Sequence, residues 1–222
     1  MDTISGICFI FQGLKFYRMG ILSSSVSITR YKVEGKLDQP IIETISRGLK
    51  KNAIPEIDED STEKTSGWTS LHNPYQPDFS GSSFVYGNYL VFSLRMDKKN
   101  ISPKVLKKRL MIESARRLAR SGREYLSRNE KQLLKDQVMH DLSLKIPATP
   151  NIYDIIWNYE ESRLWYFTNL KNANEELETL FIRSFELTLI RLFPYTTAVL
   201  TSELNDHQKD ALGNLSPTPF VA

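Results

Sequence analysis

The segment 82–97, SSFVYGNYLVFSLRMD, contains two apolar runs separated by Gly87-Asn88. A short glycine-containing loop between apolar runs is typical of a β-hairpin, whose strands pair antiparallel. A second pair of runs, IYDIIWN at 152–158 and RLWYFT at 163–168, has the same pattern. Two hairpins exclude a purely parallel sheet, so we expect an antiparallel sheet with helices packed on it.

Strands and helices are also expected on either side of these hairpins. Alternating polar and apolar residues from Ser25 to Val33 predict a half-buried strand. Apolar residues at helical spacing predict one helix between Asp38 and Pro55, and a long amphipathic one over 172–192. The run TTAVL at 196–200 predicts a last short strand.

Residues 103–144 predict a helical hairpin inserted between the two β-hairpins. Ser102-Pro103 is a good helix start, because serine caps a helix and proline fits its first turn. Ser127-Arg-Asn-Glu130 is a capping box that opens a second helix. The expected order is therefore β-α-β-β-α-α-β-β-α-β, an α+β fold.

This helical hairpin also gathers the positive charge of the chain. Residues 104–137 hold eleven Lys and Arg but only four Asp and Glu, whereas the whole chain has a formal net charge of +3. Like charges on one helix repel each other, and a bound polyanion would neutralise them. The alternative is an ordinary solvated helix surface.

Four of the arginines, at positions 109, 116, 120 and 123, would share one sector of a helix that turns about 100° per residue. Such a polyanion would be DNA or RNA, and the predicted DNA-contacting residues are Lys104, Lys107, Lys108, Arg109, Arg116, Arg117, Arg120, Arg123, Arg128, Lys131 and Lys135.

The sequence offers little catalytic chemistry. Cys8 is the only cysteine, the three histidines lie far apart, and neither standard phosphate-binding glycine pattern is present. The acidic residues 58–60 could bind a divalent cation, but they lack the spacing of a calcium loop, and a solvated loop is the better interpretation. We therefore expect a non-enzymatic protein without cofactor or metal, and a metal-dependent nuclease is the least favoured alternative.

No apolar run reaches the length of about 20 residues that spans a bilayer. The apolar run ICFIF near the N-terminus is short and no small-residue cleavage site follows it, so we expect a cytoplasmic protein. Residues 1–18 are interpreted as an extension before Met19, residues 19–200 as one domain, and residues 201–222 as a tail.

Several segments, in this order, resemble one known family. They are Gly67-Trp68, YLVFSLRMDKKNISPKVLKKRL at 89–110, SRNEKQLLKDQVMHDL at 127–142, and YDIIWNYEESRLWYFTNLKNANEELETLFIRSF at 153–185. Together they are similar to the RdgC family of bacterial recombination-associated proteins. The similarity extends from about Met19 to about Leu200.

The resemblance implies a non-enzymatic protein that forms a ring-shaped homodimer around duplex DNA without reading its sequence. Such a protein would be nucleoid-associated and would limit the access of RecA to DNA indirectly. The chain departs from the family in two places. Family members continue past the position of Leu200 with a segment that contributes to the ring, whereas this sequence stops at Ala222, so the alternatives are an open clamp on DNA or a protein that only dimerises. The loop IPATPN at 146–151 also lacks the basic and aromatic residues usual in the family.

Two further expectations concern partners. Aromatic residues crowd the second β-hairpin, so we expect part of that surface, or the adjacent 172–192 helix, to be buried in a homodimer. The rival interpretation is that all these rings lie in the core of the monomer. A protein-interaction module that docks the basic hairpin on an acidic partner is the main alternative to DNA binding.

Overall fold

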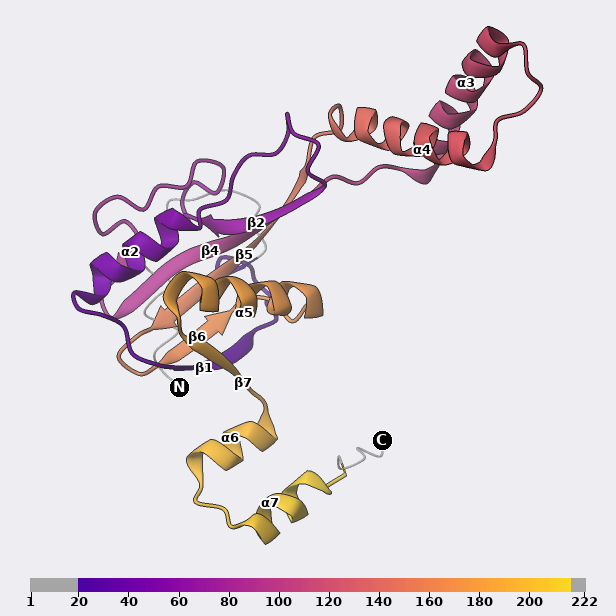
Figure 1. Cartoon of the computed structure of the whole chain (residues 1–222). Helices are drawn as coiled ribbons and strands as arrows, with labels where there is room; N and C mark the ends of the chain where they lie inside the picture. The colour runs from indigo at the N-terminus through magenta and orange to yellow at the C-terminus, as the bar shows by residue number, and fades with distance from the viewer. Residues whose placement is uncertain (1–19, 217–222) are drawn as a thin grey trace.

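The computed structural model describes residues 20–216, so the expected extension 1–18 and Met19 lie outside the described residues. Its centre is an antiparallel sheet of seven described strands in the order β2-β4-β5-β6-β1-β7, with β3 paired to β4 (Figure 1). The strands are β1 (Thr29–Glu34), β2 (Lys64–Thr69), β3 (Val85–Tyr86), β4 (Tyr89–Lys98), β5 (Thr149–Asn158), β6 (Arg163–Tyr166) and β7 (Thr188–Leu192).

The helices occupy three places (Figure 1). Helices α2 (Ile41–Lys51) and α5 (Lys171–Phe185) lie on one face of the sheet. The pair α3 (Pro103–Ser121) and α4 (Arg128–Ser143) extends away from it, and α6 (Pro194–Thr201) and α7 (Asp206–Gly213) follow β7. The expected α+β fold with an inserted helical hairpin is therefore confirmed.

The main core lies between the sheet and helices α2 and α5. Trp68, Trp157 and Tyr166 are almost completely buried there, and Phe181 and Phe185 of α5 pack against Trp157 with ring centroids 5.0 and 5.5 Å away. A smaller cluster on the opposite face includes the partly buried Trp165 and Phe167. The aromatic residues of the second hairpin are thus divided between the two faces of the sheet, and Trp165 and Phe167 remain partly exposed.

The region after residue 170 differs from the expectation. Helix α5 ends at Phe185 because Glu186 adopts a left-handed conformation with φ of 58°. The following residues form β7 and pair with β1. The prediction of a helix over residues 188–192 is therefore wrong. The predicted strand 196–200 is the helix α6, in which Pro194 occupies the first turn. Proline is common both just after a helix and in the first turn of one. Pro194 was predicted to end a helix, but it begins α6. The expected tail contains α7.

Strand β2 was missed because Gly67 interrupts its pattern of side chains. The backbone of residues 52–54 passes beside this strand, where Ile54 N donates to Trp68 O at 3.0 Å and Trp68 N donates to Asn52 O at 2.9 Å. A Cβ atom at Gly67 would lie 2.5 Å from the backbone of Ile54. Glycine is therefore needed for this close approach.

Changing Gly67 to Ala is expected to lower the free energy of unfolding by about 1–3 kcal/mol, since the backbone at Ile54 must move to admit the methyl group. Urea denaturation followed by circular dichroism measures the change. Gly213→Ala is the control, because the backbone at Gly213 is not left-handed and the added Cβ would meet only Tyr195, at an ordinary contact distance of 3.8 Å. Equal effects of both changes would show that packing at Gly67 is not the reason.

Candidate nucleic-acid interface

The basic helical hairpin is carried on the longest strands of the sheet. Strands β4 and β5 pair along their whole length, from Tyr89↔Asn158 to Lys98↔Thr149. Helix α3 begins soon after β4 ends, and α4 ends shortly before β5 begins. We call α3, α4 and the loop between them the arm. In Figure 1 the arm projects beyond the sheet and away from α2 and α5.

The arm has a small apolar core of its own. Leu126, Leu134, Val138 and Leu142 are buried between its helices, and partly buried leucines of α3, among them Leu106, pack against them. No residue of α3 is itself buried, so this helix is covered by α4 along one side only. Most of its circumference is therefore available to a partner.

The predicted DNA-contacting residues are all exposed except Arg117, which is half-buried. Three of them have polar partners within the arm: Arg116 pairs with Glu113 at 2.8 Å, Arg123 with Glu130 at 2.6 Å, and Arg117 donates to Gln137 at 2.5 Å. Within residues 20–216, no ion pair involves the others, which are Lys104, Lys107, Lys108, Arg109, Arg120, Arg128, Lys131 and Lys135.

The expected stripe of four arginines is only partly formed. Arg109, Arg116 and Arg120 lie on α3 within a sector of about 40°, as helical geometry requires. Arg123 does not continue the stripe, because α3 ends at Ser121 and Gly122 reverses the chain with φ of 65°. The lysines of α3 lie in other sectors. Positive charge thus surrounds the arm instead of marking one side.

Glu130 fixes the junction between the two helices. Its backbone N–H donates to Ser127 Oγ and its carboxylate accepts from Ser127 N, which confirms the predicted capping box. These bonds and the guanidinium of Arg123 lower the pKa of Glu130 to about 2. The carboxylate therefore stays ionised at neutral and weakly acidic pH and neutralises one arm cation.

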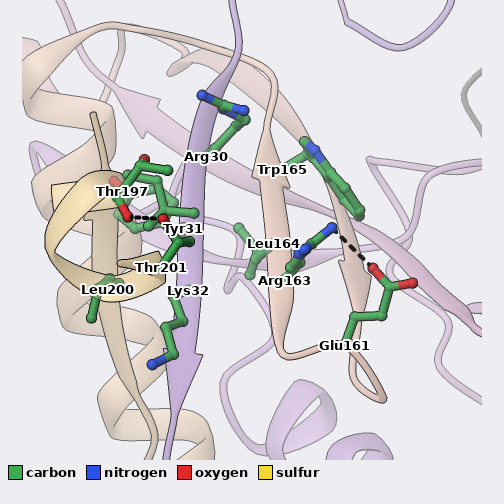
Figure 2. A pocket seen from close by; sticks show the side chains of 11 residues that line it. Arg30, Tyr31, Lys32, Glu161, Arg163, Leu164, Trp165, Thr197, Leu200 and Thr201 are labelled. Atoms are coloured by element: carbon green, nitrogen blue, oxygen red, sulfur yellow. Dashed lines mark hydrogen bonds and ion pairs between the residues drawn. The ribbon is translucent and has the colours of Figure 1, made fainter. Parts of the chain in front are cut away.

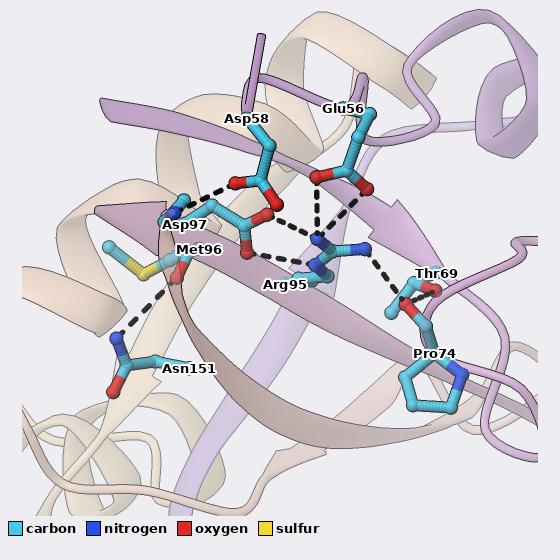
Figure 3. A network of polar contacts seen from close by, with 9 residues as sticks. Glu56, Asp58, Thr69, Pro74, Arg95, Met96, Asp97 and Asn151 are labelled. Atoms are coloured by element: carbon cyan, nitrogen blue, oxygen red, sulfur yellow. Dashed lines mark hydrogen bonds and ion pairs between the residues drawn. The ribbon is translucent and has the colours of Figure 1, made fainter. Parts of the chain in front are cut away.

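The acidic loop 58–60 fastens the base of the arm to the sheet. The ammonium of Lys99, a buried residue, donates to the carbonyl oxygens of Asp58, Asp60 and Ser143 at 3.1, 2.5 and 2.7 Å. The Asp58 carboxylate accepts from the backbone N–H of Ala148 at 2.7 Å (Figure 3). The loop therefore connects the base of the arm to the sheet through hydrogen bonds, and it is not simply a solvated loop as predicted. Lys99 contacts the backbone carbonyl oxygens of this loop and not its carboxylates.

A buried ion pair lies at the same end of β4. Arg95 Nε donates to Asp97 Oδ1 at 2.8 Å, and both residues are buried (Figure 3). Glu56 adds a longer contact of 3.3 Å. Burial alone would lower the pKa of Arg95, but the bond to Asp97 and the two negative charges raise it. The sequence reading missed this pair, whose only signal was an Arg-x-Asp within an apolar strand.

The described residues show neither a metal-binding cluster nor a membrane-spanning helix. Across residues 20–216, no three or more His, Cys, Asp or Glu side chains gather where they could hold a metal ion. Within the same range, no helix has the length and apolar character needed to cross a membrane. No protein-family model matches the sequence, and no curated protein matches it.

Proposed function

We propose that the arm binds the phosphate backbone of duplex DNA without reading its sequence. The observation that carries the proposal is the set of exposed arm cations without a carboxylate partner in the described chain. Eight such side chains on a projecting element repel one another unless an anion is present. Phosphates spaced along a duplex would neutralise the cations on the side of the arm that faces the DNA.

The resemblance to the RdgC family supports a finer proposal. Two copies of the chain form a homodimer that holds the duplex as an open clamp, and the bound DNA becomes less accessible to RecA. In this arrangement the projecting arms meet the DNA while the sheet and its helices provide the frame. The proposed protein has no catalytic role on the DNA.

Salt titration of DNA binding tests the proposed contacts. Fluorescence anisotropy with a labelled 30-base-pair duplex is expected to give a logarithmic affinity that falls linearly with the logarithm of salt concentration. Its slope should be about −0.9 for each phosphate contacted. Two duplexes of unrelated sequence should bind with equal affinity. Single-stranded DNA and RNA are added as competitors to measure the preference for duplex DNA. Affinity independent of salt, or restricted to one sequence, would contradict backbone binding.

One observation favours a second function, the docking of the arm on a protein. Met111, Tyr125 and Leu133 are large apolar residues of the arm with exposed fractions of 65%, 75% and 65%. Aromatic and methionine side chains are enriched in the centre of protein interfaces. Changing Tyr125 and Leu133 to Ser should leave DNA affinity nearly unchanged under the first proposal. Loss of DNA binding in this variant would contradict contacts made through the arm cations alone, and unchanged DNA binding would leave these apolar residues available to a protein partner.

A further inference from the structure

A pocket lies on the side of the sheet opposite α2 and α5, and none of its lining residues belongs to the arm. It has a volume of about 440 Å³ and is lined by residues of β1, β6, β7 and α6 (Figure 2). Arg30 pairs across the sheet with Trp165 on one side and Leu192 on the other. Paired residues share a face of the sheet, so these three side chains point to the same side.

The pocket has a cationic end. Lys32 pairs with Arg163 in the register, two residues along from Arg30, and all three cations therefore lie on one face. Lys32 contacts Glu34 at 3.0 Å and Arg163 contacts Glu161 at 3.3 Å, and both pairs are largely exposed to solvent. Arg30 forms no ion pair with any described residue and is exposed. A guanidinium with five donors is therefore available to an anion.

The rest of the pocket is apolar, with a hydroxyl group at its wall. Trp165 is half-buried and lines the cavity together with Leu192 and Leu200. Thr197 Oγ1 is buried and has no hydrogen-bond partner within residues 20–216. A buried hydroxyl without a partner is uncommon in folded proteins, and a ligand in the pocket it lines would supply one.

We infer that this pocket binds one nucleotide unit, with the phosphate on Arg30 and Lys32 and the base against Trp165. A cation beside an indole ring matches a ligand that joins a phosphate to a planar ring. The cavity volume falls within the range of small-molecule sites. The nucleotide can be free or part of a single strand, since both present the same two groups. None of the lining residues belongs to the arm, so this inference does not rest on the proposed function.

Titration with thymidine 5′-monophosphate and with a four-residue thymidine oligonucleotide tests the inference. Trp68 and Trp157 are buried, so quenching of tryptophan emission should report the partly exposed Trp165. We expect saturable quenching. Equal affinity for both ligands identifies a free nucleotide as the natural form, and binding of the oligonucleotide alone identifies a single strand.

The oligonucleotide titration is performed on a variant in which four arm cations are neutralised, so that binding to the arm is weakened. This variant changes to Gln the residues Arg109, Arg120, Lys131 and Lys135. Quenching should persist in it whether or not the arm binds DNA.

Arg30→Gln should weaken binding of these ligands by about tenfold, the effect of one lost charge-assisted hydrogen bond. Arg183→Gln on the opposite side of the sheet is the matched control and should change nothing. Because Arg30 is exposed, its substitution is not expected to affect folding. The inference is overturned if neither ligand binds, if Arg30→Gln binds normally, or if inorganic phosphate competes as well as the nucleotide does.

Discussion

A variant in which four arm cations are neutralised is expected to bind duplex DNA at least about tenfold more weakly at low salt, while its fold is retained. Two arginines and two lysines are changed to Gln, all exposed and without an ion pair in the described chain: Arg109, Arg120, Lys131 and Lys135. Glutamine keeps nearly the same helix propensity, so the arm should remain helical. The salt slope should fall by about one unit for each lost phosphate contact.

A matched variant separates a site from a mere effect of net charge. It also replaces two arginines and two lysines, all exposed, on helices α2 and α5: Arg47, Lys50, Lys51 and Arg183. Anisotropy measured on both variants under the same conditions gives the comparison. We expect near-normal affinity for the second variant. Equal weakening of both would mean that the arm is not an interface, and normal binding of both would make it a solvated surface.

Asp97→Ala is expected to lower the free energy of unfolding by about 3–5 kcal/mol. Asp97 is completely buried and accepts from the buried guanidinium of Arg95, so its removal leaves that charge with only the exposed Glu56. An uncompensated buried charge is costly. Chemical denaturation measures the loss, and Asp136→Ala on the exposed surface of α4 is the control.

A double variant tests the reason for this effect. Replacing the pair by apolar residues, as Arg95→Met with Asp97→Leu, removes both charges and should recover much of the lost stability. If the double variant is as unstable as Asp97→Ala, the loss comes from packing and not from the unpaired guanidinium.

The elements that the sequence predicted well are those with local signals. The capping box at Ser127 and Glu130, the glycine turn at Gly87 and the proline start at Pro103 each act within a few residues. Local chemistry of this kind needs no knowledge of the rest of the fold. The antiparallel sheet followed directly from the two hairpins.

The elements that were missed depend on distant partners. Strand β2 exists because it pairs with β4 and accommodates the backbone near Ile54, and β7 exists because it pairs with β1. Apolar spacing over 188–192 suits a helix as well as a strand, and only the sheet decides between them. Such pairings are not visible in the spacing of residues.

The sequence predicted which cations belong to the candidate site, but it did not predict how these side chains are placed and paired. All the predicted cations are found on the arm or in its loop, yet Arg123 and Arg116 are neutralised by neighbouring glutamates. The hydrogen bonds made by Lys99 were not expected either, because their acceptors are backbone carbonyls from two separate segments. A sequence shows which side chains are charged. It does not show which backbone carbonyl oxygens are available to accept hydrogen bonds from them in the folded protein.

Lysine footprinting tests the central claim, that the arm is the surface in contact with DNA. The protein is acetylated with and without saturating duplex DNA, and the modification of each lysine is measured by mass spectrometry. The exposed Lys107, Lys108, Lys131 and Lys135 should be protected, whereas Lys51 and Lys171 on the helices of the sheet should react equally in both samples. Unchanged reactivity of the arm lysines, with protection of those on α2 and α5, would contradict the account.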